Sequence, residues 1–165
     1  MSNEPLDLEH FDLDTAWLIG TTLTTKSREQ RLPVTISIQL GMQRVFHAAL
    51  PGTSADNDSW VDRKSQVVRR FGCSSQEVHS RYVGDDADKF FTTFALSPAQ
   101  YAPWGGAVPI RVRGSMIGVL AVSGLESTED HELALSALRL ATTADGSGNR
   151  RPSDSDVDLG RTDVR

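Results

Sequence analysis

Hydrophobic and polar residues alternate with a period of two in two separate parts of the chain. One part covers residues 34–40 and 44–50, and the other covers residues 108–113, which a glycine turn connects to an uninterrupted apolar run over 117–122. Alternation with this period is typical of strands that bury one face, and the short glycine-bearing turn within each part joins antiparallel neighbours. The pattern therefore predicts two hairpins. The strand over 117–122 is apolar on both faces, so we expect it to be central in the sheet.

The segments outside the hairpins predict helices. These helices are expected over residues 15–30, 58–71, 74–82, 89–94 and 128–143. Residues 78–84 are the candidate for a fifth strand. The order of helix, hairpin, helices, hairpin and helix indicates an antiparallel sheet of four to five strands flanked by α-helices, an α+β fold.

Capping residues set the expected helix boundaries. Asp12 or Asp14 is the predicted N-cap of the first helix, and Asn57 or Asp58 that of the second, because short polar side chains accept hydrogen bonds from the first free N–H groups. Gly72 is expected to end the second helix in a left-handed conformation.

The domain organisation follows from the same pattern. An acidic lead-in over residues 1–14 precedes one domain over residues 15–144. Residues 145–165 contain only three apolar side chains. This segment cannot bury enough surface to offset its ordering entropy, so we predict a disordered tail.

Composition narrows the function classes. A chain of 165 residues with 38% apolar content is long enough to bury a core of its own. The net charge of −5 argues against nucleic-acid binding, and the single cysteine, Cys73, excludes an internal disulfide. No apolar run is long enough for a membrane helix and no signal-peptide pattern is present, so we expect a cytoplasmic protein that does not associate with membranes.

A glycine pair and a lysine are the first candidates for chemistry. Gly105 and Gly106 form either a loop that enters a strand or a pocket rim of backbone N–H groups. Lys64 falls on the apolar stripe of the second helix, where it either extends to the edge or projects its ammonium into a cleft. Arginines nearby make this helix basic, which favours an anionic small-molecule ligand; they are Arg63, Arg69 and Arg70.

The start of the last helix holds the second group of candidates. Ser127 and Asp130 fit the capping pattern of a serine followed three residues later by an acid. His131 lies beside them and is a metal or haem ligand, a proton carrier or a surface residue. On the strands, His47, Arg111 and Arg113 are expected to share a polar sheet face that no helix covers. No zinc, calcium or serine-hydrolase spacing is present, so the sequence leaves enzymatic activity open.

Four segments resemble the haem-degrading-domain family, of the GlcG and HbpS type. These segments are residues 47–64, 70–75, 97–114 and 118–138, and the first carries an Asp-Asn-Asp-x-Trp-x-x-Arg-Lys block that is typical of one branch. The resemblance covers about residues 8–143. It implies a profilin-like α+β fold, assembly into homo-oligomers, and haem as the candidate cofactor.

The resemblance also implies a set of ligand-binding positions. Carried over by motif, they are Trp60, Arg63, Lys64, Gly105, Gly106, Pro109, Asp130 and His131. Members of this branch often have a histidine directly before the glycine pair, where this chain has Trp104. A tryptophan cannot replace a metal ligand, but it can stack on a flat molecule.

These observations lead to one main hypothesis and two rivals. The main one is a homo-oligomeric small-ligand-binding protein that binds or degrades haem, with Arg63 and Lys64 on its propionates and His131 as the axial or proton-transfer group. The alternative is a non-enzymatic oligomeric scaffold or chaperone partner. A third idea, an oxidoreductase or isomerase acting on a small acid, depends only on Lys64 and His131.

Overall fold

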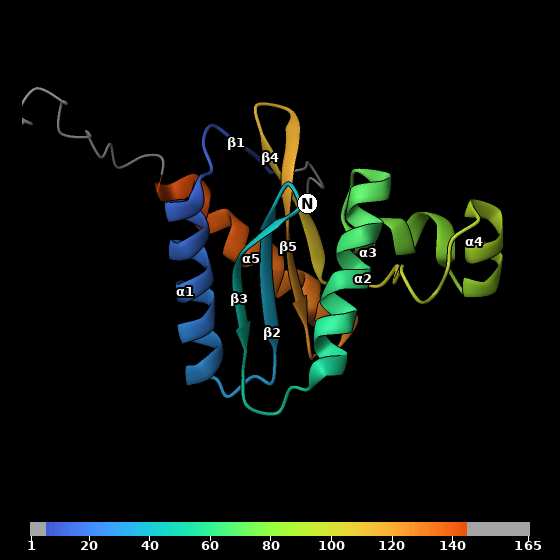
Figure 1. Cartoon of the computed structure of the whole chain (residues 1–165), viewed down its shortest axis with the longest axis horizontal. Helices are drawn as coiled ribbons and strands as arrows, with labels where there is room; N and C mark the ends of the chain where they lie inside the picture. The colour runs from blue at the N-terminus through green and yellow to red at the C-terminus, as the bar shows by residue number, and fades with distance from the viewer. Residues whose placement is uncertain (1–5, 145–165) are drawn as a thin grey trace, which may run out of the picture.

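A computed structural model describes residues 6–144 of the chain (Figure 1). The predicted tail over 145–165 lies outside these residues. Along the chain the elements are β1 (Asp7–Leu8), α1 (Leu13–Glu29), β2 (Thr35–Leu40), β3 (Gln43–Ala49), α2 (Ala55–Phe71), α3 (Ser75–Val78), the π-helix η1 (His79–Val83), α4 (Ala87–Phe94), β4 (Ala107–Val112), β5 (Ser115–Ser123) and α5 (Ser127–Ala144).

The strands form one mixed sheet in the order β1-β4-β5-β2-β3. Both predicted hairpins are confirmed, and β5 is central, paired antiparallel with β4 and β2. The fifth strand is β1, which pairs parallel with β4. The suggestion of a strand over residues 78–84 is wrong, because this segment is helical. Strand β1 has only two residues, which is too short to show a period-two pattern in the sequence. Leu8 nevertheless lies in the core and is only 3% exposed.

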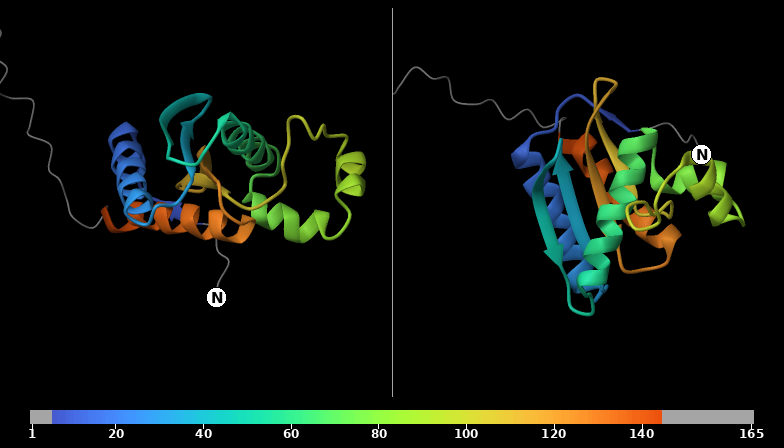
Figure 2. Two further views of the ribbon diagram at one scale, coloured as in Figure 1. Left: turned by 90° about the horizontal axis from the view of Figure 1, so that it is seen from below. Right: turned by 45° about the vertical axis from the view of Figure 1, so that its right-hand side comes forward.

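Helices cover both faces of this sheet. Figure 2 shows α1 and α5 on one face and α2 on the other. Successive strand side chains point to opposite faces, so Ile36 and Ile38 of β2 face α1 and α5, whereas Thr35 and Ser37 face α2. The α+β class is therefore confirmed, with the helices in two layers.

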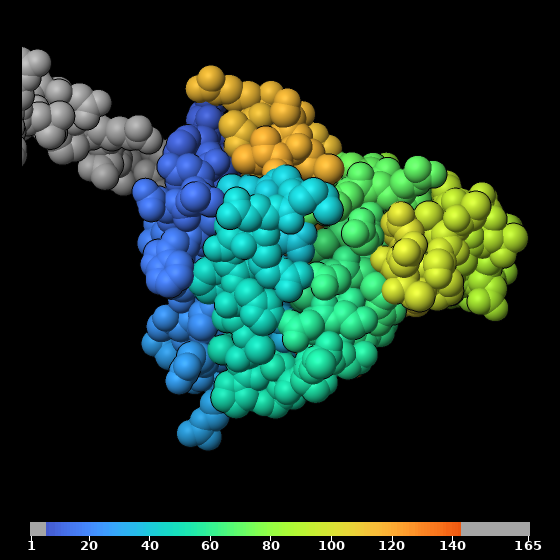
Figure 3. Space-filling model, in the orientation of Figure 1, coloured from blue at the N-terminus to red at the C-terminus, as the bar shows by residue number. Residues whose placement is uncertain are grey.

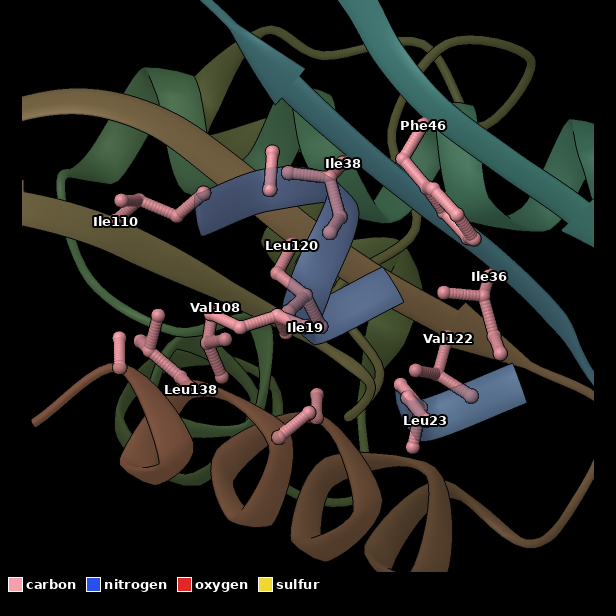
Figure 4. Packing of buried hydrophobic residues seen from close by; sticks show 14 of the residues in the cluster. Ile19, Leu23, Ile36, Ile38, Phe46, Val108, Ile110, Leu120, Val122 and Leu138 are labelled. Carbon is pink, nitrogen blue, oxygen red and sulfur yellow. The ribbon is translucent and has the colours of Figure 1, made fainter. Parts of the chain in front are cut away.

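The main hydrophobic core lies between the sheet and the α1–α5 layer. In Figure 4, Ile19 and Leu23 of α1 and Leu138 of α5 approach the apolar side chains of the strands. The opposite side holds a much smaller cluster between α2 and the sheet, made of Val61, Val68, Ala107, Val119 and Ala121. Strands β4 and β5 contribute to both clusters, and β5 does so with large apolar side chains on each of its faces.

The helix ends follow the capping rules with one shift. Asp12 caps α1 by accepting the Thr15 N–H at 2.8 Å, as predicted. The prediction of Asn57 or Asp58 as the cap of α2 is wrong, because α2 begins three residues earlier and Ser54 is its cap. The Asn57 Oδ1 instead accepts a hydrogen bond from the Ser54 N–H, which completes a capping box. Gly72 ends α2 with a φ of 71°, as expected.

The expected uncovered polar face does not exist, because α2 lies across it. His47 meets Asp58 of α2 at 2.6 Å, and Arg111 donates to the Gly72 carbonyl at the other end of the same helix. Arg113 lies in the exposed turn between β4 and β5, 3.4 Å from Glu9. Helix α2 therefore satisfies two of the three side chains that the sequence assigned to solvent.

A third hydrophobic cluster, rich in aromatic residues, surrounds α4. In the space-filling view of Figure 3, the segment around α4 projects from the main body. Phe90 is 1% exposed there and packs against Phe71 and Phe94. These contacts attach the projection to the end of α2.

Candidate functional site

A pocket of about 310 Å³ opens where the first half of α2 meets the loop after β5 and the start of α5. Two tryptophans, Trp60 and Trp104, form part of its wall. Lys64 and Asp130 also line it. The remaining lining residues are Asp56, Asn57, Ser123, Gly124, Leu125 and Ser127.

Lys64 and Asp130 form a buried ion pair at this pocket. The Lys64 Nζ lies 2.9 Å from Asp130 Oδ2 and 3.2 Å from the Val122 carbonyl oxygen. The residues are 3% and 1% exposed. The second carboxylate oxygen of Asp130 accepts the Leu125 N–H at 3.0 Å. One pair of side chains therefore joins α2, β5 and α5.

Burial favours the neutral form of each partner. Desolvation lowers the pKa of Lys64, opposed by the charge of Asp130. Desolvation likewise raises the pKa of Asp130, opposed by Lys64 and by the Leu125 and Gly124 N–H groups. Removing either partner would leave a polar group in a place that water scarcely reaches, so the pair is held together by the cost of breaking it.

The glycine pair lets the backbone pass very close to this ion pair. Gly106 has a φ of 128°, and a Cβ there would lie 2.5 Å from the Val122 oxygen and 2.7 Å from Lys64 Nζ. At Gly105 a Cβ would lie 2.3 Å from both Gln76 Oε1 and the Ser127 carbonyl oxygen. No side chain fits at either position. Both glycines are therefore needed for packing beside the pocket.

Ser127 and Asp130 do not form the predicted capping pair. The Ser127 hydroxyl accepts the Gly105 N–H at 2.6 Å, and Asp130 is occupied by Lys64. The prediction is wrong because both side chains bond to groups outside the helix. Glu129 performs the local role instead, by accepting the Glu126 N–H at 3.2 Å.

The two tryptophans meet edge to face, with ring centroids 5.9 Å apart and an interplanar angle of 83°. The Trp60 Nε1 donates to Asp56 at 3.2 Å. The Arg63 guanidinium lies 4.3 Å from the Trp60 ring centroid, a cation–π distance. Arg63 lines a neighbouring groove with Tyr101 rather than the pocket itself. The tryptophan pair thus separates a cation on one side from the pocket on the other.

The structure brings together only part of the predicted set. Trp60, Lys64, Trp104 and Asp130 line one pocket, with Gly106 against Lys64. Pro109 lies in β4 opposite Val119, outside the pocket lining. His131 is also outside it; burial lowers the pKa of its half-buried ring, and its Nδ1 has no hydrogen-bond partner within residues 6–144.

Sequence reasoning did not anticipate the contributions of Asp56, Asn57, Ser123 and Leu125 to the lining. The sequence did contain a signal for the ion pair, because a lysine that is buried on the apolar stripe of a helix needs an acidic partner. Within residues 6–144 no cluster of three or more histidine, cysteine or acidic side chains could hold a metal ion. None of the described helices has the length and apolar character to cross a membrane.

Comparisons with known proteins add the family. The family described as "Haem degrading protein HbpS-like" matches residues 11–139. A UPF0303 protein of Streptomyces avermitilis is 45% identical over 134 residues, covering 81% of this chain and 82% of the relative. The UPF0303 protein SCO2848 of Streptomyces coelicolor is 42% identical over 134 residues, covering 81% and 84%.

Solved structures share the fold. The crystal structure of the Ybr137w protein is similar with a TM-score of 0.76 and 31% identity, over 84% of this chain and 82% of that one. The crystal structure of HbpS matches with a TM-score of 0.63 and 14% identity over 85% of this chain and 96% of that one. A PduOC complex with haem matches with a TM-score of 0.66 and 17% identity over 78% and 93%. The last two likenesses show the fold alone.

Proposed function

The chain belongs to the HbpS-like family, and on this premise we propose that it is a homo-oligomeric small-ligand-binding protein whose ligand occupies the pocket beside Lys64. The observation that carries this proposal is the ion pair at the pocket. An ammonium group has three N–H donors, and the described residues offer Lys64 two acceptors, Asp130 and Val122. A ligand oxygen in the pocket would supply the third.

The walls indicate the shape of the ligand. Trp60 and Trp104 present aromatic surface, which favours a flat molecule. The volume of about 310 Å³ lies near the lower end of the range of about 300–1,000 Å³ that small-molecule sites have. A small aromatic or carbonyl compound therefore fits one chain's pocket better than a whole porphyrin, which would need walls beyond this pocket.

Haem is the first ligand to test because a PduOC relative is described as a complex with haem. Its anionic propionates could pair with Arg63 at the outer side of Trp60. The charge of Lys64 is already compensated by Asp130, so Arg63 is the better partner for a full anion. His131 remains the axial or proton-transfer candidate by resemblance, and the ring of His79, 6.1 Å from Trp104, is a second one.

A hemin titration tests this proposal. We expect a shifted Soret band and saturable quenching of tryptophan fluorescence, both weakened in Trp104→Ala. The matched control is Met42→Ala, because Met42 is an exposed side chain in the turn between β2 and β3 and is outside the pocket lining. His79→Ala and His131→Ala then show which histidine the iron uses. No Soret shift at any hemin concentration would rule out haem as the ligand, and equal loss of binding in Trp104→Ala and Met42→Ala would contradict the assignment to this pocket.

Helix α1 favours the alternative of a non-enzymatic oligomeric scaffold. Leu13, Trp17 and Leu18 are 59%, 65% and 53% exposed on this helix, and large exposed apolar side chains grouped together are typical of interaction surfaces. We propose that a second copy of the chain covers them. Light scattering of Leu18→Glu should show smaller particles than the wild type, whereas an unchanged mass would place the contact elsewhere.

A further inference from the structure

We infer that Lys64 binds a carbonyl compound covalently, as an imine on its Nζ. The inference rests on the proposed function, because it requires that the pocket admits a small ligand. It adds the chemical class of that ligand, an aldehyde or ketone with a flat group that Trp60 and Trp104 can contact.

The Lys64 nitrogen makes two hydrogen bonds to described residues, which leaves its third bonding direction without a hydrogen-bond acceptor among them. A neutral amine has two N–H groups and a lone pair. The two acceptors, Asp130 Oδ2 at 2.9 Å and the Val122 oxygen at 3.2 Å, use two directions. The described residues offer no third hydrogen-bond acceptor; the Trp60 ring centroid lies 6.0 Å from the nitrogen, and Lys64 lines the pocket. With both N–H groups held by the protein, the lone pair is left for the carbonyl carbon of a ligand.

Asp130 is placed to carry the proton that this reaction moves. The Lys64 ammonium first loses its pocket-facing proton to solvent, so that its two remaining N–H groups stay on Asp130 Oδ2 and the Val122 oxygen. The amine then attacks the carbonyl carbon and forms the C–N bond; Asp130 takes one nitrogen proton, and the oxygen takes a proton from solvent to give a carbinolamine. Asp130 returns its proton to the hydroxyl group, the C–O bond breaks, and water leaves. An aldehyde and an ammonium group thus become a protonated imine and one water, with Asp130 again a carboxylate and with no oxidant or reductant.

The surroundings favour the neutral amine. Lys64 is 3% exposed, and desolvation lowers its pKa while Asp130 opposes that change and Arg63 adds to it. Asp56 is the other charged group of the pocket lining. Lysines that act as nucleophiles are activated by such burial and by neighbouring cations. The close backbone of Gly106 closes one side of the nitrogen, since even a Cβ would lie 2.7 Å from it.

The chain supplies its own controls, since it contains only three lysines. They are Lys26, Lys64 and Lys89. Lys26 and Lys89 are exposed and lie outside the pocket lining. Treatment of the full chain with benzaldehyde and cyanoborohydride, followed by peptide mapping, measures the reduced adduct at each lysine. We expect Lys64 to react at least about tenfold faster than the other two, because the pocket holds the aldehyde beside its nitrogen.

Two further measurements separate the inference from the proposed function. Benzyl alcohol has the same ring without the carbonyl, and saturation-transfer NMR reports whether it binds. Binding of benzyl alcohol with labelling at Lys64 no faster than at Lys89 overturns the inference and leaves the pocket assignment standing. Neither binding nor labelling overturns both. Lys26→Arg and Lys89→Arg should leave the Lys64 adduct unchanged, and loss of the adduct in either variant contradicts its assignment.

Discussion

The two faces of the sheet carry different kinds of side chains. Toward α1 and α5 the strands present large apolar side chains such as Ile36, Ile38 and Leu120, all fully buried. Toward α2 the same strands present small or polar ones, including Thr35, Ser37 and Ala121. Polar contacts then join α2 to the sheet, with Arg69 donating to Gln39 at 2.6 Å and His47 meeting Asp58 at 2.6 Å.

This difference assigns stability and function to different sides. Apolar burial contributes about 25 cal/mol for each Å² removed from water, and most of it lies on the α1–α5 side. A buried polar group costs free energy unless it is paired. The α2 side carries such groups, among them Lys64 and Asp130 beside the pocket. Apolar burial on the α1–α5 side therefore stabilises the fold enough to offset the cost of the buried polar groups on the α2 side.

Breaking the buried ion pair should have the largest effect. Lys64→Met removes the ammonium and leaves the Asp130 carboxyl group buried without its partner. We expect a loss of about 3–5 kcal/mol in the free energy of unfolding, measured by urea denaturation. The double variant Lys64→Met with Asp130→Leu should recover much of this loss, because no unpaired charge remains.

The recovery distinguishes a charge effect from a packing effect. If the double variant is as unstable as Lys64→Met, the cost comes from the shape of the site near Gly106 and not from an uncompensated group. A stable double variant also gives a direct functional test, since the structural task of the pair is then met by apolar side chains. Hemin or aldehyde binding that survives in it would contradict a role for Lys64 in the site.

The next effect compares neighbours on β2 that point to opposite faces. Ile38 is fully buried in the main core, and Ile38→Ala should cost about 3 kcal/mol because it removes apolar contacts and leaves a cavity. Ser37 is 1% exposed toward α2, and its hydroxyl has no partner within residues 6–144. Ser37→Ala should therefore change the free energy of unfolding by less than about 1 kcal/mol. Equal losses in the two variants would contradict the contrast between the faces.

Thr35 offers a gain in stability on the polar face. Its side chain is fully buried and its hydroxyl has no hydrogen-bond partner among the described residues. Thr35→Val keeps the shape and removes a buried group that costs about 1–3 kcal/mol when unsatisfied. We expect the variant to be more stable by about 1 kcal/mol in urea denaturation. A loss instead would show that the hydroxyl has a partner in solution, such as a buried water.

The sequence predicted most of the fold because the main sheet has two chemically different faces. The period-two pattern is present in β2, β3 and β4, and β5 is an apolar run that follows a glycine turn, so all four strands could be assigned. Strand β1 could not, since two residues show no period. The start of α2 was misplaced because three consecutive polar residues, Asp56 to Asp58, each resemble a cap, while Ser54 alone has the geometry.

The sequence identified individual residues of the site but not which of them contact one another. Trp60 and Lys64 were selected from one motif, and Trp104 and Asp130 from two others. Lys64 and Asp130 are 66 positions apart, and only the fold reveals their contact. His131 was selected beside Asp130. Neighbouring helix residues point about 100° apart, so the carboxylate of Asp130 can face the pocket while His131 is outside its lining.

The smallest expected effect concerns how the helices on the two faces are capped. Asp12 caps α1, and its pKa is lowered to about 2, chiefly by the hydrogen bond from the Thr15 N–H. Ser54 caps α2 with a hydroxyl that does not titrate. Asp12→Ala should cost about 0.5–1 kcal/mol at pH 6, the usual value of a cap.

This difference should disappear in acid for α1 only. A carboxyl group whose pKa is lower in the folded state stabilises the fold above its unfolded pKa, near 3.8, and loses that contribution as the pH falls toward about 2. The free-energy gap between wild type and Asp12→Ala should therefore shrink between pH 4 and pH 2, while the gap for Ser54→Ala stays constant. Parallel denaturation series at several pH values measure both gaps. A constant gap for Asp12→Ala would mean that its carboxyl group caps α1 equally well when protonated, and acid would then not distinguish the two faces.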